Sequence, residues 1–104
     1  MPGIDFTTVR QRITMAEVLG RLGFQPTSVR GEALRGPCPV HRSASPGSRS
    51  FSVHRGLGRY RCFRCGSRGN ALELWAAAHR LSLYEAAVTL CQAVGVEVPW
   101  ITRW

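Results

Sequence analysis

The chain has 104 residues, a formal net charge of +8, four cysteines and 44% apolar residues. Its length favours a single domain with a modest core, which a bound metal would usefully supplement. No apolar run approaches the roughly 20 residues needed to span a bilayer, and the first residues lack the basic and apolar regions of a secretory signal. We therefore expect a cytoplasmic protein, with no membrane partner, whose cysteines serve as thiols or metal ligands rather than disulfides.

Residues 5 to 22 are predicted to be helical. Asp5 is a suitable N-cap for a first short helix. Thr14 and Glu17 have the spacing of a capping box, in which each side chain bonds to the backbone N–H of the other residue. A second helix should therefore begin at this box and end near Gly23.

Two strands joined by a hairpin are predicted in the middle of the chain. Residues 50 to 54 alternate polar and apolar, which places Phe51 and Val53 on the inner face of a half-buried strand. A turn at residues 56 to 58 would return the chain as a second strand over residues 59 to 62. Shorter extended pieces are expected before this hairpin.

Two short motifs flank the hairpin. Cys38 and His41 have two residues between them, and after twenty further residues Cys62 and Cys65 repeat this spacing. Such a spacing lets one tight turn direct both side chains at one point, and two turns facing each other make a tetrahedral structural zinc site. Gly66 follows the last ligand, where such a knuckle often needs a positive φ. The motifs predict one structural Zn²⁺, and their pairing argues against chance core cysteines or a disulfide.

Two further helices are predicted after the second motif. Asn70 is a suitable N-cap for the first, which carries Trp75 on its apolar side. Ser82 and Glu85 form a second capping box. Cys91 lies on the apolar stripe of the helix that this box opens, so we expect a small buried residue rather than a metal or redox group.

The tail from residue 96 has little helical or turn signal. Trp100 and Trp104 either fold back onto the helices or mark a docking surface, and the sequence leaves both open. The predicted organisation is one α+β domain over residues 1–104. It comprises N-terminal helices (1–24), a zinc ribbon with a small antiparallel sheet (25–68), C-terminal helices (69–95) and the tail (96–104).

The positive charge is concentrated in the ribbon. All fourteen basic residues are arginine, and nine of them lie between Arg30 and Arg68, where Glu32 is the single acid. Elsewhere five arginines are balanced by five acids. A GC-rich genome would explain the absence of lysine but not the clustering, which favours a polyanionic partner.

Four arginines and one aromatic residue are the candidate contacts to nucleic acid. Arg59 and Arg61 should project from one strand face about 7 Å apart, close to one backbone step of an extended single strand. Arg64 would extend this row, and Arg55 would flank it across the hairpin turn. Phe63 suits either packing against the sheet or stacking on a base. The alternative is that the arginines are solvated surface residues.

Taken in order, the segments 38–41 (Cys-Pro-Val-His), 50–53 (Ser-Phe-Ser-Val) and 62–66 (Cys-Phe-Arg-Cys-Gly) resemble the N-terminal zinc-binding domain of DnaG-type bacterial and phage DNA primases. The resemblance covers nearly the whole chain. It implies a zinc ribbon that recognises single-stranded template in DNA replication and supports primer initiation. The zinc ligands of the family correspond here to Cys38, His41, Cys62 and Cys65.

The sequence also departs from that family. A longer Ser/Gly/Arg loop occupies residues 42 to 49, Arg64 stands where glycine is usual, and Asn70 stands where aspartate is usual. These departures leave the template preference open. In the family, catalysis belongs to a separate TOPRIM domain with clustered carboxylates on Mg²⁺, whereas the six acids of this chain are scattered.

We therefore expect no enzymatic activity from the chain by itself. It would serve a primase catalytic domain or a helicase in trans, as in a primosome, or form one domain of a longer primase. The second hypothesis is a zinc-stabilised adaptor whose helices and tryptophan tail dock a replication or mobile-element protein. A thiol redox switch at Cys62 and Cys65 is disfavoured because Cys38 and His41 complete a closed site. The oligomeric state does not follow from the sequence.

Overall fold

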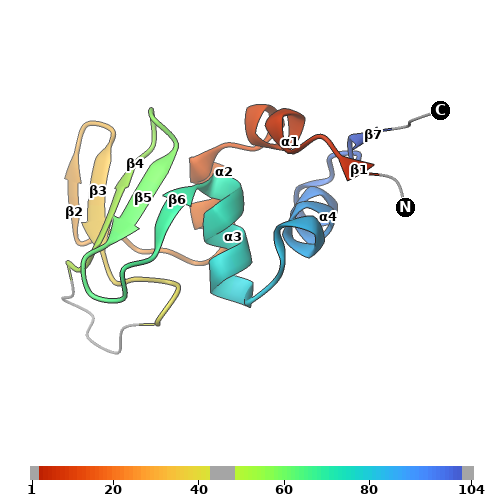
Figure 1. Ribbon diagram of the computed structural model, residues 1–104. Coiled ribbons are helices and arrows are strands. Elements are labelled where there is room, and N and C mark those ends of the chain that lie inside the picture. Colours follow the sequence, from red (N-terminus) through yellow and green to blue (C-terminus); the bar gives the residue numbers. More distant parts are fainter. Residues whose placement is uncertain (1–2, 43–48, 102–104) are drawn as a thin grey trace.

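The structure, a computed structural model, describes residues 3–42 and 49–101. In chain order its elements are β1 (Gly3–Ile4), α1 (Phe6–Arg12), α2 (Met15–Arg21), β2 (Ser28–Arg30), β3 (Ala33–Gly36), β4 (Phe51–His54), β5 (Arg59–Cys62), β6 (Arg68–Asn70), α3 (Ala71–His79), α4 (Leu83–Val94) and β7 (Trp100–Ile101). Figure 1 shows the larger sheet beside the helices, with β1 and β7 at the opposite end. The predicted α+β class, a small antiparallel sheet with flanking helices, is confirmed.

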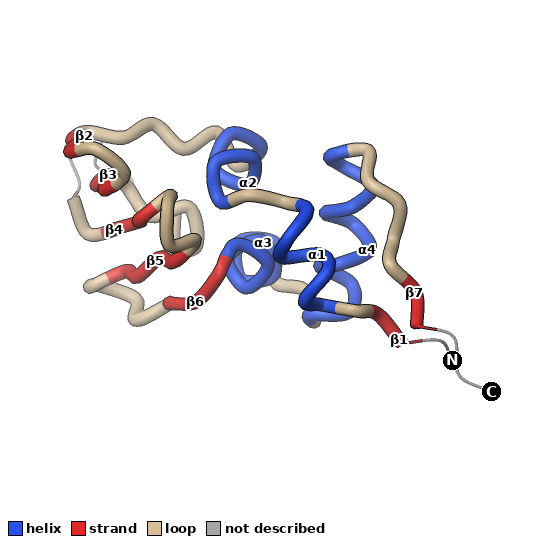
Figure 2. Tube along the Cα trace, turned by 90° about the horizontal axis from the view of Figure 1, so that it is seen from above, coloured by secondary structure: helices blue, strands red, loops and turns tan. Residues whose placement is uncertain are grey.

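Strands β2 to β6 form an antiparallel sheet in sequence order. Leu34, Val53 and Tyr60 occupy one line of the register, and because cross-strand partners share a face, all three point the same way. They are buried, as is Phe51, whose ring centroid lies 5.2 Å from that of Phe24. The helices α2 and α3 lie on this inner side, and no helix of the described residues covers the other side (Figure 2).

Local signals fix the ends of the first two helices. Asp5 accepts hydrogen bonds from the backbone N–H of Thr8 at 3.2 Å and from its hydroxyl at 2.8 Å. Thr14 and Glu17 form the expected capping box at the start of α2. Gly23 follows α2 with a φ of +71°, which suits the left-handed residue after a helix end.

The last two helices pack against each other. Asn70 and Ser82 cap them, each within a capping box. The predicted core position of Trp75 is confirmed: its side chain is buried between the helices and its indole N–H donates to Thr89 Oγ1 at 3.0 Å. Cys91 is fully buried, as expected for a small apolar residue of α4.

Two features of the sheets were not indicated by the sequence. Residues Arg68–Asn70 form the edge strand β6 before α3 begins. The tail also forms a strand, because β7 pairs antiparallel with β1 and places Trp100 opposite Ile4. Trp100 therefore folds back, with its ring centroid 6.0 Å from that of Tyr84, although 45% of the residue stays exposed. Trp104 and residues 43–48 of the predicted loop lie outside the described residues.

Over the described ranges, no helix is both long and apolar enough to cross a membrane.

Candidate metal centre and nucleic-acid interface

The first knuckle follows directly from the end of β3. Cys38 lies two residues after Gly36, and its thiol accepts a hydrogen bond from the backbone N–H of Val40 at 3.3 Å. This turn directs both Cys38 and His41 towards the second knuckle. The geometry is that expected when two residues separate a pair of metal ligands.

The second knuckle repeats this arrangement at the end of β5. Cys62 is the last residue of the strand, and its sulfur accepts a hydrogen bond from the backbone N–H of Cys65 at 3.4 Å. Its carbonyl accepts one from Gly66 at 3.0 Å. Gly66 has a φ of +78°, a conformation that a side chain would strain, which explains the glycine that the motif carries.

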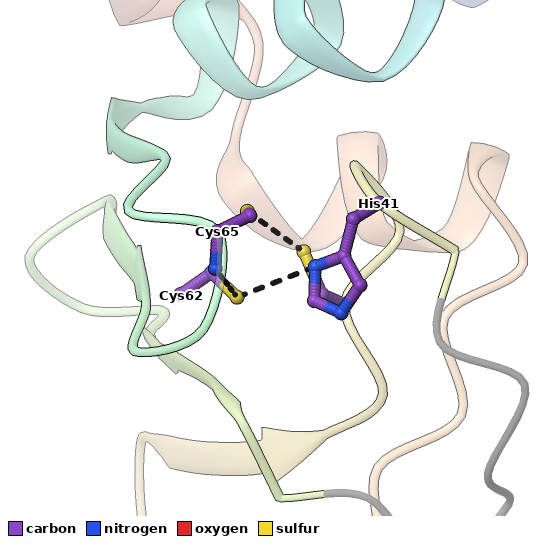
Figure 3. A group of neighbouring side chains, drawn as sticks. His41, Cys62 and Cys65 are labelled. Carbon is purple, nitrogen blue, oxygen red and sulfur yellow. Dashed lines mark hydrogen bonds between the residues drawn. The ribbon is translucent and has the colours of Figure 1, made fainter.

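The two knuckles bring four ligand atoms together (Figure 3). The ligand atoms of Cys38, His41, Cys62 and Cys65 all lie within 4.8 Å of one another. The sulfurs of Cys38 and Cys65 are 3.9 Å apart, and Cys62 Sγ is 3.5 Å from His41 Nδ1. Tetrahedral zinc with ordinary bond lengths requires about 3.8 Å between sulfurs and about 3.5 Å between sulfur and nitrogen. The four residues are arranged to bind one zinc ion, as the motifs predicted.

The thiols of Cys38 and Cys62 differ in pKa. Burial raises the pKa of the Cys38 thiol to about 12. Burial also acts to raise the pKa of Cys62, but hydrogen bonds from the backbone N–H groups of Cys65 and Arg64, together with those from the thiols of Cys65 and Cys38, lower the pKa overall. Zinc binds the thiolates, so metal binding must release protons, and the affinity for zinc falls as the pH falls.

The side of the sheet away from the helices carries two rows of side chains, which we call the open face. Cross-strand partners share a face, so the register defines each row by its members. The first row is Ser28, Arg35, Ser52, Arg61 and Arg68. The second row is Arg30, Ala33, His54, Arg59 and Asn70. Five of these ten residues are arginine and none is an acid, so the two rows carry a net positive charge.

The predicted contact residues are distributed unevenly over this surface. Arg59 and Arg61 share the open face, as the strand alternation implied, and Arg64 is exposed in the second knuckle. Arg55 lies beyond the last paired residue of β4, where it forms an ion pair with Glu32 at 3.6 Å. Its charge is therefore partly balanced locally.

Sequence reasoning missed three arginines of the open face. Arg35 and Arg68 belong to the first row, and Arg30 belongs to the second. Their position depends on which residues pair between strands distant in the sequence. The one available signal was the clustering of arginine between residues 30 and 68.

Phe63 is exposed over 58% of its surface, just beyond β5. The guanidinium carbons of Arg35 and Arg61 lie 5.2 Å and 5.0 Å from the centre of its ring, both within cation–π range. Its ring thus contacts two arginines of the first row and is not buried against the sheet.

A hollow of about 560 Å³ lies at the end of the open face, where β5, β6 and the first turn of α3 meet. Arg59, Arg61 and Arg68 line it together with Asn70 and Glu73. The carboxylate of Glu73 is engaged in the capping box, where it accepts from the backbone N–H of Asn70 at 3.0 Å.

The fold and the ligand geometry together define a zinc-ribbon protein. Comparison with known families identifies the family more closely, because residues 4–103 match the CHC2 zinc finger. The chain belongs to this family, the zinc-binding domain of DnaG-type primases, and the resemblance drawn from its motifs is confirmed.

Relatives and a solved structure agree with this assignment. The chain is 30% identical to a DNA primase of Mycobacterium leprae over 91% of its own length and 14% of the relative. It is 30% identical to a DNA primase of Thermotoga maritima over 86% of its length and 15% of that protein. The structure of the zinc-binding and RNA polymerase domains of the Aquifex aeolicus primase matches with a TM-score of 0.70 at 26% identity, covering 91% of this chain and 22% of the other. The chain thus spans only about one seventh of the curated relatives' length.

Proposed function

We propose that the zinc ribbon binds single-stranded template on its open face during primer synthesis in DNA replication. The module has no catalytic role of its own and acts in the cytoplasm with a primase catalytic domain or a helicase. Membership in the primase zinc-finger family supports the process. The observation that supports DNA as the ligand is the open face, with five arginines and no acid in its two rows.

The chemistry of arginine suits this role. Its planar guanidinium donates to phosphate through two N–H groups at once and also stacks on a base. Phosphate contacts supply affinity without reading sequence, so five such groups on one face provide a surface that binds a single strand generally. The sheet holds them on one side because its other side is covered by helices.

A salt titration tests this proposal. Binding of a fluorescent single-stranded oligonucleotide should weaken steeply with salt, since each phosphate that the protein neutralises adds about 0.7 to the log–log slope. The double variant Arg59→Ala with Arg61→Ala should lower the slope by about 0.7 for each phosphate that it no longer neutralises. Zinc content and melting temperature should stay nearly unchanged.

The matched control is Arg10→Ala with Arg12→Ala. Both residues are exposed on or at the end of α1, and the double variant removes the same two charges. Its slope should stay close to that of the wild type. Equal decreases in both double variants would mean that net charge alone drives binding, and the proposal of an open-face site would fail.

A second candidate function rests on the other end of the molecule. Leu83, Trp100 and Ile101 are large apolar residues that remain exposed there. Such residues suit a protein contact, as in an adaptor that docks a replication or mobile-element protein. This function alone predicts little binding of single-stranded DNA at any salt concentration, so the same titration separates it from the first.

A further inference from the structure

The first row of the open face contains three arginines in one line, and this line runs perpendicular to the strands. Arg35, Arg61 and Arg68 stand on β3, β5 and β6 at one level of the register. Neighbouring strands lie about 4.8 Å apart, so the first two are about 10 Å apart and the last two about 5 Å apart. The second row is less continuous, since Ala33 and His54 separate Arg30 from Arg59.

Contacts within the protein hold Arg35 and Arg61, two arginines of the first row, in place. Arg35 donates from Nε and from Nη2 to the carbonyl of Arg49, at 3.1 Å and 2.6 Å. These bonds use two of its five N–H donors and leave three for a ligand. Phe63 contacts the guanidinium groups of both Arg35 and Arg61. Side chains ordered before binding lose less conformational entropy when the ligand arrives.

The end of the row is also defined. The hollow of about 560 Å³ beside Arg61 and Arg68 has room for a nucleotide, and Arg59 and Glu73 also line it. A carboxylate repels phosphate, so a phosphate chain following the row would stay over the arginines. Glu73 therefore limits the basic surface at this edge of the sheet.

We infer that a single strand crosses the sheet along Arg35, Arg61 and Arg68, perpendicular to the β-strands, and that Phe63 is a positioning residue for the first two. This rests on the proposed binding of single-stranded DNA. It differs from a path along β5, which would use Arg59 and Arg61 as neighbouring contacts. The ring of Phe63 orders guanidinium groups and is not the platform on which a base stacks.

Single substitutions on neighbouring strands separate the two paths. With a fluorescent oligothymidine as the probe, Arg68→Ala and Arg35→Ala should each lower the log–log salt slope by about 0.7. The matched variants Arg59→Ala and Arg30→Ala remove the same charge from the same face, and each should lower the slope by clearly less, because these residues flank the path. A decrease with Arg59→Ala but not with Arg68→Ala would overturn the crossing path while leaving the proposed function intact. Equal decreases in all four variants would also overturn it.

Salt-independent or absent binding by the wild type would instead defeat the proposed function itself. Melting temperature and zinc content of each variant report separately on folding, which matters for Arg35 because it also contacts Arg49. The comparison of Arg68→Ala with Arg59→Ala distinguishes the path across the strands from the path along β5, because these residues lie on adjacent strands in different rows.

A double-mutant cycle tests the role of Phe63. Phe63→Leu should weaken binding relative to the wild type. Phe63→Tyr should bind like the wild type, because the tyrosine ring keeps the cation–π contact. When Arg35→Ala and Arg61→Ala are already present, Phe63→Leu should weaken binding no further. A base stacked on the ring would instead cost about 5- to 150-fold in affinity in that background too, and that result would overturn the positioning role.

Discussion

The sheet and the helices of this small protein are stabilised in different ways. Strands β2 to β6 have only three or four residues each, and no described helix covers one face of their sheet. The helices carry three capping boxes and most of the fully buried apolar residues. The ribbon holds the whole formal charge of the chain, while the flanks are neutral.

This difference separates the binding surface from the source of stability. A small sheet with an uncovered face buries little apolar area, so it needs another source of free energy. Zinc at the end of the hairpin supplies it, and the arginines therefore need not contribute to the core. The helices cover the inner face, and one apolar cluster joins the two parts.

Removal of zinc should have the largest effect, and it should disorder the ribbon more than the helices. Structural zinc contributes about 10 kcal/mol of apparent folding free energy in small domains, so Cys38→Ala or Cys62→Ala should leave the ribbon disordered. Amide NMR of β4 and β5, together with elemental analysis for zinc, measures this. Cys91→Ala is the matched control, because it removes a buried thiol of α4 outside the metal site and should be mild. Native, folded protein without bound metal would contradict the prediction.

Truncation of Trp75 should destabilise the helices but leave the zinc site intact. Its side chain is buried and bonds to Thr89, so Trp75→Ala should cost roughly 3–5 kcal/mol through the cavity it leaves. Thermal unfolding measures the loss of stability, and the folded protein should still bind one zinc. A melting temperature close to that of the wild type would place Trp75 at a partner surface instead.

The caps of α3 and α4 provide a finer comparison, since one lies at the junction with the ribbon. Asn70 ends β6 and caps α3, whereas Ser82 caps α4 away from the sheet. Asn70→Ala and Ser82→Ala should each cost about 1 kcal/mol, because alanine keeps the backbone pairing of β6. Denaturant unfolding measures both values. A much larger destabilisation for Asn70→Ala would show that this cap couples the two parts.

The smallest expected effect concerns Asp5 and acid. Hydrogen bonds from the side chain and then the backbone of Thr8 hold the pKa of this carboxyl below its ordinary value of 3.8. Because the folded pKa is the lower one, this stabilisation is fully present above pH 4 or so and disappears as the pH falls through the folded pKa. Asp5→Asn keeps a capping side chain but does not titrate.

The free energy of unfolding of the two proteins, measured in parallel, tests this. The free energy of unfolding of the wild type minus that of Asp5→Asn should decrease below about pH 4. Taking this difference cancels the effect of zinc release in acid, which both proteins share. A constant difference from pH 6 to pH 2 would contradict the role of the Asp5 charge.

The sequence alone determined those features whose partners lie close in the chain. The capping pairs Thr14–Glu17 and Ser82–Glu85 span three residues, so one helical turn brings them together. The zinc ligands were recognisable for the same reason, because each knuckle places two ligands with a spacing of two, and the metal itself joins the knuckles.

Only the tertiary structure decided which residues meet across the sheet. Arg35 and Arg61 lie 26 positions apart, and they share a row because β4 pairs with both β3 and β5 in a particular register. A shift of one residue would turn either side chain to the other face. The pairing of β1 with β7, which returns Trp100 to the helices, likewise joins the two ends of the described chain. Such contacts depend on packing of the whole molecule, since no local pattern specifies the partner of a strand.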